Sequence, residues 1–201
     1  MSLSEVLYSC YDNLDKATLK QTVKDIVGSG ERLKSYINNI TDLSKLSSLS
    51  YELQKKEFNF TELVKSRPFL YTKIFSDDKK QKFKLEVEED IIIDGDEYLI
   101  TQAIDNLISN AVKYGKDKEV MISLKRTPDK RVEFKIKDQG IGIAKHELFS
   151  IFEAFAVSSK TKTPAGGRGI GLALVKKIIA AHNGRIWATS DTNGSSFYFV
   201  I

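Results

Sequence analysis

Two asparagines and a lysine are spaced so that their side chains would share one face of a helix. In "DNLISNAVKYG", Asn110 follows Asn106 by four residues and Lys113 follows Asn110 by three. Side chains three or four residues apart are neighbours on a helix. An Asn carbonyl oxygen can coordinate Mg²⁺, and Lys supplies a compact positive charge for a phosphate. The spacing therefore indicates a magnesium and phosphate site, with a solvated helix face as the alternative.

A second polar group follows residues 131–137, where apolar and polar residues alternate as in a strand. The segment leads into "DQGIGI", in which Asp138 is followed by Gly140 and Gly142. The carboxylate could accept a hydrogen bond from an exocyclic amine, and the glycines would let a flat ring approach the backbone. The alternative is an ordinary turn, since Asp and Gly are common turn residues.

A third stretch, "GGRGIGLALVKKI", opens with alternating glycines and continues with the apolar periodicity of a helix. The glycines are Gly167, Gly169 and Gly171. The stretch is not a P-loop, because Leu172 and Ala173 stand where that motif needs Lys and then Ser or Thr. It is not a dinucleotide-binding turn, because the polar loop "SSKTKTPA" precedes it instead of a strand. The free N–H groups at the start of a helix favour an anion. The alternative is a flexible loop followed by a helix.

The segment between the second and third stretches is long for a loop in a compact domain, and such loops are usually lids or binding loops. Phe152 and Phe155 are expected to pin one end of it into the core. Lys160, Lys162 and Arg168 would place positive charge in it. For the two lysines, the favoured alternative is an exposed basic loop.

Composition limits the class of protein that could position these residues. The chain has 201 residues, of which 41% are hydrophobic and 29% charged, as in a globular domain with or without an appendage. A net charge of +4 is too small to argue for nucleic-acid binding. The single cysteine, Cys10, excludes an internal disulfide and fits a reducing compartment. No apolar run approaches the roughly 18 residues of a membrane helix, so a cytoplasmic location is expected.

Residues 1–50 have the periodicity of a helical hairpin with one short and one long arm. The apolar positions of the long arm are Leu19, Val23, Ile26, Gly30, Leu33, Ile37 and Ile40. They alternate in steps of four and three, which is the seam of a coiled coil. Such a seam is usually buried in a bundle, often by pairing with a second copy. The alternative is that it packs against the rest of its own chain.

Residues 51–201 are expected to form an α+β sandwich, a mixed sheet with helices on one face. We expect helices at about 60–77, 97–114 and 169–182, and strands at 51–59, 82–90, 119–127, 131–138, 184–190 and 195–201. Asp94 or Asp96 is placed to cap the central helix.

Taken in order, these stretches resemble the sequence boxes of the ATP-binding domain of sensor histidine kinases, in the GHKL superfamily. "NLISNAVKY" is similar to the N box, "DQGIGI" to the G1 box, "FEAF" to the F box and "GGRGIGLALV" to the G2 box. Residues 29–46 resemble the second helix of the family's dimerisation and phosphotransfer hairpin. The resemblance implies a Bergerat-type two-layer α/β sandwich over 51–201, preceded by a partial hairpin over 1–50.

The resemblance also implies roles in binding ATP and Mg²⁺. Asn110 would coordinate Mg²⁺, Asn106 would line the same site and Lys113 would contact phosphate. Tyr114 would pack beside the ribose or adenine, and Asp138 would bind the adenine amine. The remaining roles fall to the glycines and their neighbours. Gly140 and Gly142 would shape the pocket, Gly167, Gly169 and Gly171 would hinge a lid and present N–H groups to phosphates, Arg168 would add charge, and Ser195 or Ser196 would hold a water near adenine.

Asn106 separates the expected activity from that of related ATPases. Gyrase-like and chaperone-like members of the superfamily carry Glu at this position, and a carboxylate can act as a general base. An amide cannot take a proton, so Asn106 favours phosphoryl transfer to a histidine over hydrolysis. The resemblance implies a response-regulator receiver domain as the partner and a homodimer formed through the hairpin. The alternatives are a GHKL-type ATPase and a non-catalytic nucleotide-binding module.

The chain has two histidines, and neither lies within residues 1–50. His146 is expected to be a solvated residue at a helix start, and His182 to interact with the last carbonyls of a helix. We therefore expect the phosphoacceptor histidine to lie upstream of residue 1 and this chain to be a fragment that binds ATP but does not autophosphorylate. A natural chain without the acceptor is the alternative.

Overall fold

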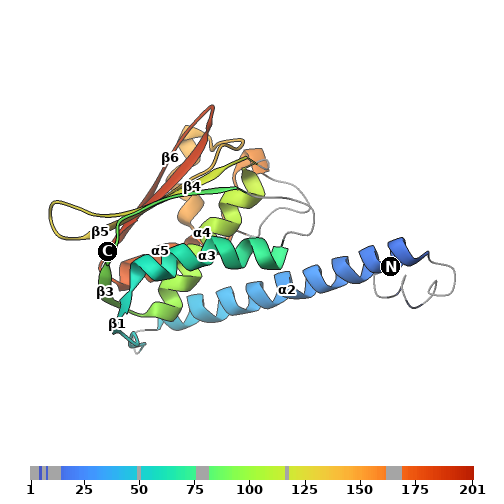
Figure 1. Ribbon diagram of the computed structural model, residues 1–201, viewed down its shortest axis with the longest axis horizontal. Helices are drawn as coiled ribbons and strands as arrows, with labels where there is room; N and C mark the ends of the chain where they lie inside the picture. Colours follow the sequence, from blue (N-terminus) through green and yellow to red (C-terminus); the bar gives the residue numbers. More distant parts are fainter. Residues whose placement is uncertain are drawn as a thin grey trace. The chain divides into compact units, whose positions relative to one another are not determined.

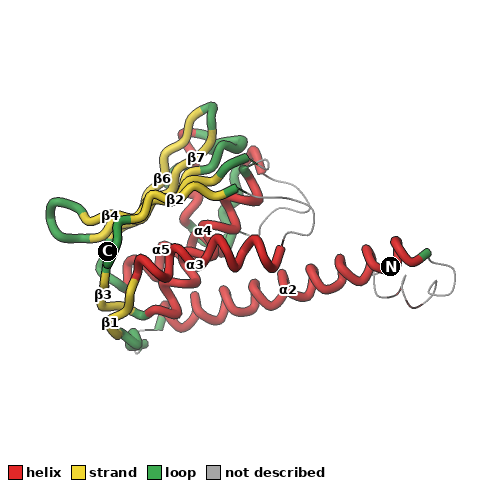
Figure 2. The backbone as a smooth tube through the Cα atoms, viewed as in Figure 1, coloured by secondary structure: helices red, strands yellow, loops and turns green. Residues whose placement is uncertain are grey.

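The structure, a computed structural model, describes residues 5, 8, 15–48, 51–75, 82–115, 118–161 and 169–201. Contacts divide the chain into two compact units, Met1–Asp42 and Leu43–Ile201. Figure 1 shows the elements of each unit in chain order, and Figure 2 separates helices from strands by colour.

The first unit consists of most of helix α2 (Lys16–Ser47). Asp15 begins the helix by accepting hydrogen bonds from the backbone N–H groups of Ala17 and Thr18, at 2.9 and 3.0 Å. Large apolar side chains on this helix are exposed: Val23 44%, Val27 60%, Leu33 59%, Ile37 55% and Ile40 52%. The short first arm predicted before α2 lies outside the described residues, apart from Glu5 and Tyr8.

The second unit is built on a five-stranded sheet with the order β2-β4-β5-β7-β6. The strands are β2 (Phe83–Val87), β4 (Val120–Arg126), β5 (Val132–Lys137), β6 (Arg185–Asp191) and β7 (Gly194–Val200). The β2–β4 pair is parallel and the other three pairs are antiparallel. The sheet is therefore mixed, as the sequence predicts.

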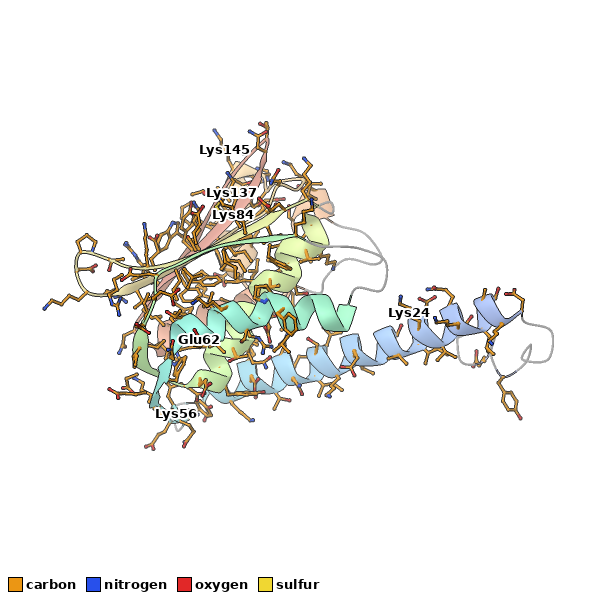
Figure 3. The ribbon with its side chains drawn as sticks, viewed as in Figure 1. Lys24, Lys56, Glu62, Lys84, Lys137 and Lys145 are labelled. Carbon is orange, nitrogen blue, oxygen red and sulfur yellow. The ribbon has the colours of Figure 1, made fainter. Side chains whose placement is uncertain are left out.

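Helices α3 (Phe60–Phe75), α4 (Glu97–Tyr114) and α5 (Gly171–Ala181) cover one face of this sheet (Figures 1 and 2). In β5 every second residue is buried, and the rings of Phe134 and Phe199 stack 4.9 Å apart in the core beneath the helices. Lys84 and Lys137 project from the opposite face (Figure 3). This confirms the predicted two-layer α/β sandwich.

Helix α4 is held at its start by a side-chain cap. Asp96 Oδ1 accepts from the backbone N–H of Leu99 at 3.1 Å, which selects Asp96 over Asp94 as the cap. The helix turns one apolar face to the core, and its buried residues are Leu99, Ile100, Ala103, Ile104, Leu107, Ile108 and Ala111. Asn106, Asn110 and Lys113 lie off this face; the two asparagines are partly buried and the lysine is exposed.

The strand predicted near residues 51–59 is shorter than expected and lies in a separate sheet. Strand β1 (Lys56–Asn59) pairs antiparallel with β3 (Ile92–Gly95), away from the main sheet. Three short 3₁₀ turns, η2 (Lys145–Glu147), η3 (Ser150–Phe152) and η4 (Ser159–Thr161), follow β5. Within the described ranges, no helix combines the length and apolarity needed to cross a membrane.

Candidate functional site

Asp138 lies directly after β5 and is fixed by the backbone around it. The residue is 3% exposed. Its Oδ1 accepts hydrogen bonds from the N–H groups of Gly140 at 2.8 Å and Ser195 at 3.3 Å. Its own N–H donates to the Ser195 carbonyl oxygen at 2.9 Å. The carboxylate is therefore held between the loop after β5 and the start of β7.

The other carboxylate oxygen of Asp138, Oδ2, accepts no hydrogen bond from any described residue. Every fully buried side-chain N or O atom in the described part of the chain has a hydrogen-bond partner, so Oδ2 must be accessible. Burial raises the pKa of Asp138, although the N–H groups of Gly140 and Ser195 act in the opposite direction. The site thus presents one accessible acceptor on a largely buried carboxyl group, which suits an amine donor on a ligand.

Gly140 and Gly142 are glycines because other backbone segments approach them closely. A Cβ on Gly140 would overlap the carbonyl oxygen of Tyr114, at the end of α4. Gly142 has φ +67°, and a Cβ there would lie 2.6 Å from the Asp191 carbonyl oxygen. The "DQGIGI" loop is therefore in contact with both the end of α4 and the β6–β7 turn.

Helix α4 meets this loop at the Tyr114 carbonyl oxygen and the start of α5 at Asn106. Asn106 donates from Nδ2 to the Gln102 carbonyl oxygen at 2.9 Å. Its Oδ1 is 2.6 Å from where a Cβ would stand on Gly171, so a larger residue there would require the Asn106 side chain to move. Lys113 is exposed, and its Nζ lies 5.1 Å from the centroid of the Tyr114 ring. The fold thus brings Asn106 to Gly171, across 65 residues of chain.

The chemistry of Asn110 fits a Mg²⁺ ligand that is shared with a ligand's phosphates. Asn110 is partly exposed, and no described residue forms a hydrogen bond with its side chain. No group of three or more His, Cys, Asp or Glu in the described ranges is arranged to hold a metal. A Mg²⁺ ion bound here would take most of its oxygen ligands from phosphates and water, which is its usual preference.

The start of α5 can receive an anion. Ile170, the residue before the helix, provides no side-chain cap, so the first N–H groups of α5 remain available to a ligand. Gly169 has φ +70° and its carbonyl oxygen accepts from Phe155 N–H at 2.9 Å. The other predicted loop residues, Lys162, Gly167 and Arg168, lie outside the described residues.

The F-box phenylalanines behave differently from each other. Phe152 is 6% exposed and packs in the core, as predicted. The prediction for Phe155 is wrong, because this residue is 73% exposed. Its backbone has φ +65°, a region that a bulky residue rarely adopts, and its N–H bonds to Gly169. Closing the loop at this point turns the ring outward.

Lys160 is exposed, as the sequence favours, and it also contacts the "DQGIGI" loop. Its Nζ donates to the Ile141 carbonyl oxygen at 3.3 Å. The segment around it is held by Glu147, which accepts from Ser158 Oγ at 2.5 Å and from the Ser159 N–H at 2.9 Å. Sequence reasoning missed Glu147, because eleven residues separate it from Ser158 and no local pattern links them.

The two serines of β7 lie on different faces of the sheet. Ser195 bonds to Asp138 and lies 3.3 Å from Ser190 Oγ, whereas Ser196 pairs across the sheet with Lys137. Ser190 Oγ also accepts from Ile143 N–H at 2.8 Å and so supports the loop after Gly142. Ser195 is therefore the serine adjacent to the site, and Ser190 is a supporting residue that the sequence did not reveal.

The histidines have the surroundings that were expected of them. The His146 side chain is 81% exposed. His182 follows α5, and its Nδ1 lies 2.8 Å from the Ile178 carbonyl oxygen, while Nε2 accepts from the backbone N–H of Asp96 at 2.9 Å. The second contact requires an unprotonated Nε2, and burial lowers the pKa of His182. This histidine joins the end of α5 to the start of α4.

Comparison with known proteins gives one family. A family model described as histidine kinase-, DNA gyrase B-, and HSP90-like ATPase matches residues 95–201. Sensor protein kinase WalK of Staphylococcus aureus (strain MRSA252) is 34% identical over 176 residues, covering 85% of this chain and 28% of the relative. The chain thus spans little more than a quarter of that curated relative.

Two solved structures have a similar fold. The crystal structure of full-length ShkA in complex with AMPPNP matches with a TM-score of 0.73 and 25% identity, covering 94% of this chain and 40% of that one. Histidine kinase ThkA, in complex with the response regulator protein TrrA, matches with a TM-score of 0.72 and 24% identity, covering 99% and 56%.

Proposed function

Because the chain belongs to the family of histidine kinase-, DNA gyrase B- and HSP90-like ATPases, we propose that it binds Mg²⁺-ATP and supplies phosphoryl groups to a histidine. Within this family, the chain groups with the ATP-binding domains of two-component sensor kinases. The observation that carries the proposal is the Asp138 carboxylate, fixed through Oδ1 and accessible at Oδ2 beside two close-packed glycines.

Adenine recognition rests on this carboxylate. Oδ2 of Asp138 accepts a hydrogen bond from the exocyclic amine of adenine, and the base lies against Gly140 and Gly142, whose tight packing against the Tyr114 and Asp191 carbonyl oxygens sets the path of the loop. Tyr114 packs at the side of the sugar or base. A hydrogen bond to a charged acceptor contributes about 1.5–3 kcal/mol, so Asp138 also discriminates against bases that lack the amine.

Phosphate binding rests on α4 and on the start of α5. Lys113 lies at the exposed end of α4 and contributes positive charge, and the uncapped N–H groups at Gly171 donate to phosphate oxygens. Asn110 supplies an amide oxygen to Mg²⁺, which neutralises charge on the transferred phosphoryl group. Gly169 and Gly171 lie where the loop meets α5, and the proposed roles of Gly167 as a further hinge glycine and of Arg168 as a positive charge fall outside the described residues.

Asn106 supports transfer to a separate acceptor over hydrolysis. Its Nδ2 donates to the helix backbone, so the amide is oriented toward Gly171 as a neutral polar group. An amide cannot remove a proton from water. The acceptor is a histidine on another segment, and the phosphoryl group then passes to an aspartate of a response-regulator receiver domain. A GHKL-type ATPase is the second candidate.

The exposed apolar side chains of α2 support the proposed homodimer. Leu33, Ile37 and Ile40 are each more than half exposed, and they follow the predicted coiled-coil seam. A contiguous apolar stripe of this kind is typical of a helix that pairs in a bundle. Residues 1–50 would then belong to the dimerisation and phosphotransfer hairpin, and residues 51–201 to the ATP-binding domain.

The test is incubation of the chain with Mg²⁺ and γ-labelled ATP, with and without a separate helical hairpin that carries an acceptor histidine from a sensor kinase relative. We expect acid-labile label on the added hairpin and none on this chain. Rapid phosphate release without the hairpin would favour the ATPase instead. Acid-labile label on His146 or His182 would contradict the proposed division between donor and acceptor.

A further inference from the structure

Glu147 clamps the segment that follows the F box. Its Oε2 accepts from Ser158 Oγ at 2.5 Å, and its Oε1 accepts from the backbone N–H of Ser159 at 2.9 Å. The Glu147 side chain is only 13% exposed, and Ser158 is 9% exposed. A carboxylate that uses both oxygens in this way fixes both the position and the direction of the chain at Ser158 and Ser159.

The Glu147 carboxyl group is ionised over the physiological pH range. The Ser158 hydroxyl, followed by the Ser159 N–H, lowers the pKa of Glu147 to about 2. The His146 ring lies 3.9 Å from Glu147 Oε1, and its side chain is largely exposed. The two hydrogen bonds to Glu147 therefore have a charged acceptor, which makes them stronger than neutral ones.

The residue that immediately follows the clamp is Lys160. It lies in the η4 turn, and its Nζ donates to the carbonyl oxygen of Ile141 at 3.3 Å. Ile141 stands between Gly140 and Gly142, the two glycines of the proposed adenine pocket. The ammonium group of Lys160 is therefore held at the edge of the nucleotide site by a backbone contact.

The segment is closed on its other side as well. Phe155 N–H donates to the Gly169 carbonyl oxygen at 2.9 Å, and Phe155 adopts φ +65° to make this contact. A positive φ in a bulky residue costs free energy and persists only where the surroundings hold it. The described residues 155–161 thus have two fixed points, Phe155 and the Ser158–Ser159 pair.

We infer that Lys160 is a further nucleotide-contacting residue and that Glu147 is the positioning residue that holds it at the site; the inference rests on the proposed binding of ATP. The Lys160 ammonium group leaves the Ile141 carbonyl oxygen for a phosphate oxygen of the bound nucleotide. Glu147 orders Ser158 and Ser159, so that the lysine starts beside the Ile141 carbonyl oxygen, at the edge of the proposed nucleotide pocket.

Affinities for ATP and for adenosine distinguish this role from general support of the fold. Both ligands need the pocket at Asp138, but only ATP offers phosphates to Lys160. Lys160→Met should weaken ATP binding roughly fivefold, as expected for a solvent-accessible charge pair, and should leave adenosine binding within twofold. Glu147→Ala should weaken ATP binding in the same selective way. Lys160→Arg, which keeps the positive charge, should bind ATP nearly as tightly as the unmodified protein.

A double-mutant cycle tests whether Glu147 acts through Lys160. The variant with both substitutions should bind ATP about as weakly as Lys160→Met alone. Glu153→Ala is the matched control, because it removes an exposed glutamate of the same segment that pairs with Lys176 at 2.7 Å. This control should bind ATP and adenosine as the unmodified protein does.

Two results would overturn the inference while leaving ATP binding intact. The first is that Glu147→Ala weakens the binding of ATP and of adenosine equally. The second is that the fold loss of ATP affinity in the double variant equals the product of the fold losses in the two single variants. An unmodified protein that binds neither ligand would instead refute the proposed function. Titration calorimetry on the complete chain, with melting temperatures recorded for each variant, gives all of these readouts.

Discussion

Replacing Asp138 by Asn should separate the recognition of adenine from the stability of the fold. Oδ1 of Asp138 accepts from Gly140 N–H and Ser195 N–H, and an amide oxygen can accept both bonds. The accessible Oδ2 becomes an NH₂ group, which donates. The substitution therefore keeps the internal hydrogen bonds and reverses the polarity of the one atom that faces the ligand.

The expected loss of ATP affinity follows from the loss of one hydrogen bond to a charged acceptor. Such a bond contributes about 1.5–3 kcal/mol, which corresponds to a loss of about tenfold to 150-fold in affinity for ATP. Free triphosphate, which does not reach Asp138, should bind within about twofold of its original affinity. Because the new NH₂ group can donate to the 6-oxo group of hypoxanthine, inosine triphosphate should gain affinity relative to ATP.

The same substitution, which weakens ATP binding, should leave the stability of the folded chain unchanged or raise it. Burial raises the pKa of Asp138 in the folded state, so the ionised carboxylate opposes folding at neutral pH. Its contribution to stability is present below the unfolded pKa of about 3.9 and is lost as pH rises through the folded pKa. The amide introduced by the substitution carries no charge, so Asp138→Asn should unfold at an equal or higher urea concentration at pH 7.

Competition titrations with ATP, inosine triphosphate and tripolyphosphate provide the assay, with urea unfolding measured on the same samples. Equal weakening of ATP and tripolyphosphate would refute the assignment of Asp138 to the base. An unchanged preference for ATP over inosine triphosphate would refute it as well. A large loss of stability would contradict the expectation that the amide keeps both internal hydrogen bonds.

Two further predictions concern the packing and the pH response of the fold. Gly140→Ala places a methyl group against the Tyr114 carbonyl oxygen and should lower the free energy of unfolding by about 1–3 kcal/mol. Gly30→Ala in helix α2 places a methyl group where no atom lies within 4 Å, so it should raise helix stability by up to about 1 kcal/mol. Calorimetric melting that shows equal effects of the two substitutions would contradict this. His182 has a lowered pKa and must accept from Asp96 N–H, so its contribution to stability is present above the unfolded pKa of about 6.5 and is lost as pH falls through and below that value. Urea unfolding between pH 8 and pH 5 should show this decline, and His182→Gln should reduce it; an identical slope in the variant would assign the decline to other groups.

Local patterns in the sequence were sufficient to predict the three helices of residues 51–201 and the five strands of the main sheet. Asp96 stands at the start of an apolar-periodic helix and caps it, and the alternating strand before Asp138 places that carboxylate at a strand end. The same reasoning joined Asn106 and Asn110 on α4, because helical spacing alone decides which side chains are neighbours.

Contacts between distant segments explain what the sequence could not predict. The ring of Phe155 was expected in the core, but its direction is set by the hydrogen bond to Gly169, fourteen residues later. The hydrogen bonds from Ser158 and Ser159 to Glu147 depend on how η2 approaches the start of η4. Strand β1 was expected to be longer, but its pairing with β3 limits it to four residues.

The central claim, that this chain binds ATP through a magnesium ion held by Asn110, is tested most directly by ATP titrations with and without Mg²⁺. The unmodified protein should bind ATP more tightly when Mg²⁺ is present, and Asn110→Ala should lose that gain. Ser109→Ala, which changes an exposed neighbour on α4, should keep it. A gain from Mg²⁺ that is as large in Asn110→Ala as in the unmodified protein would contradict the account.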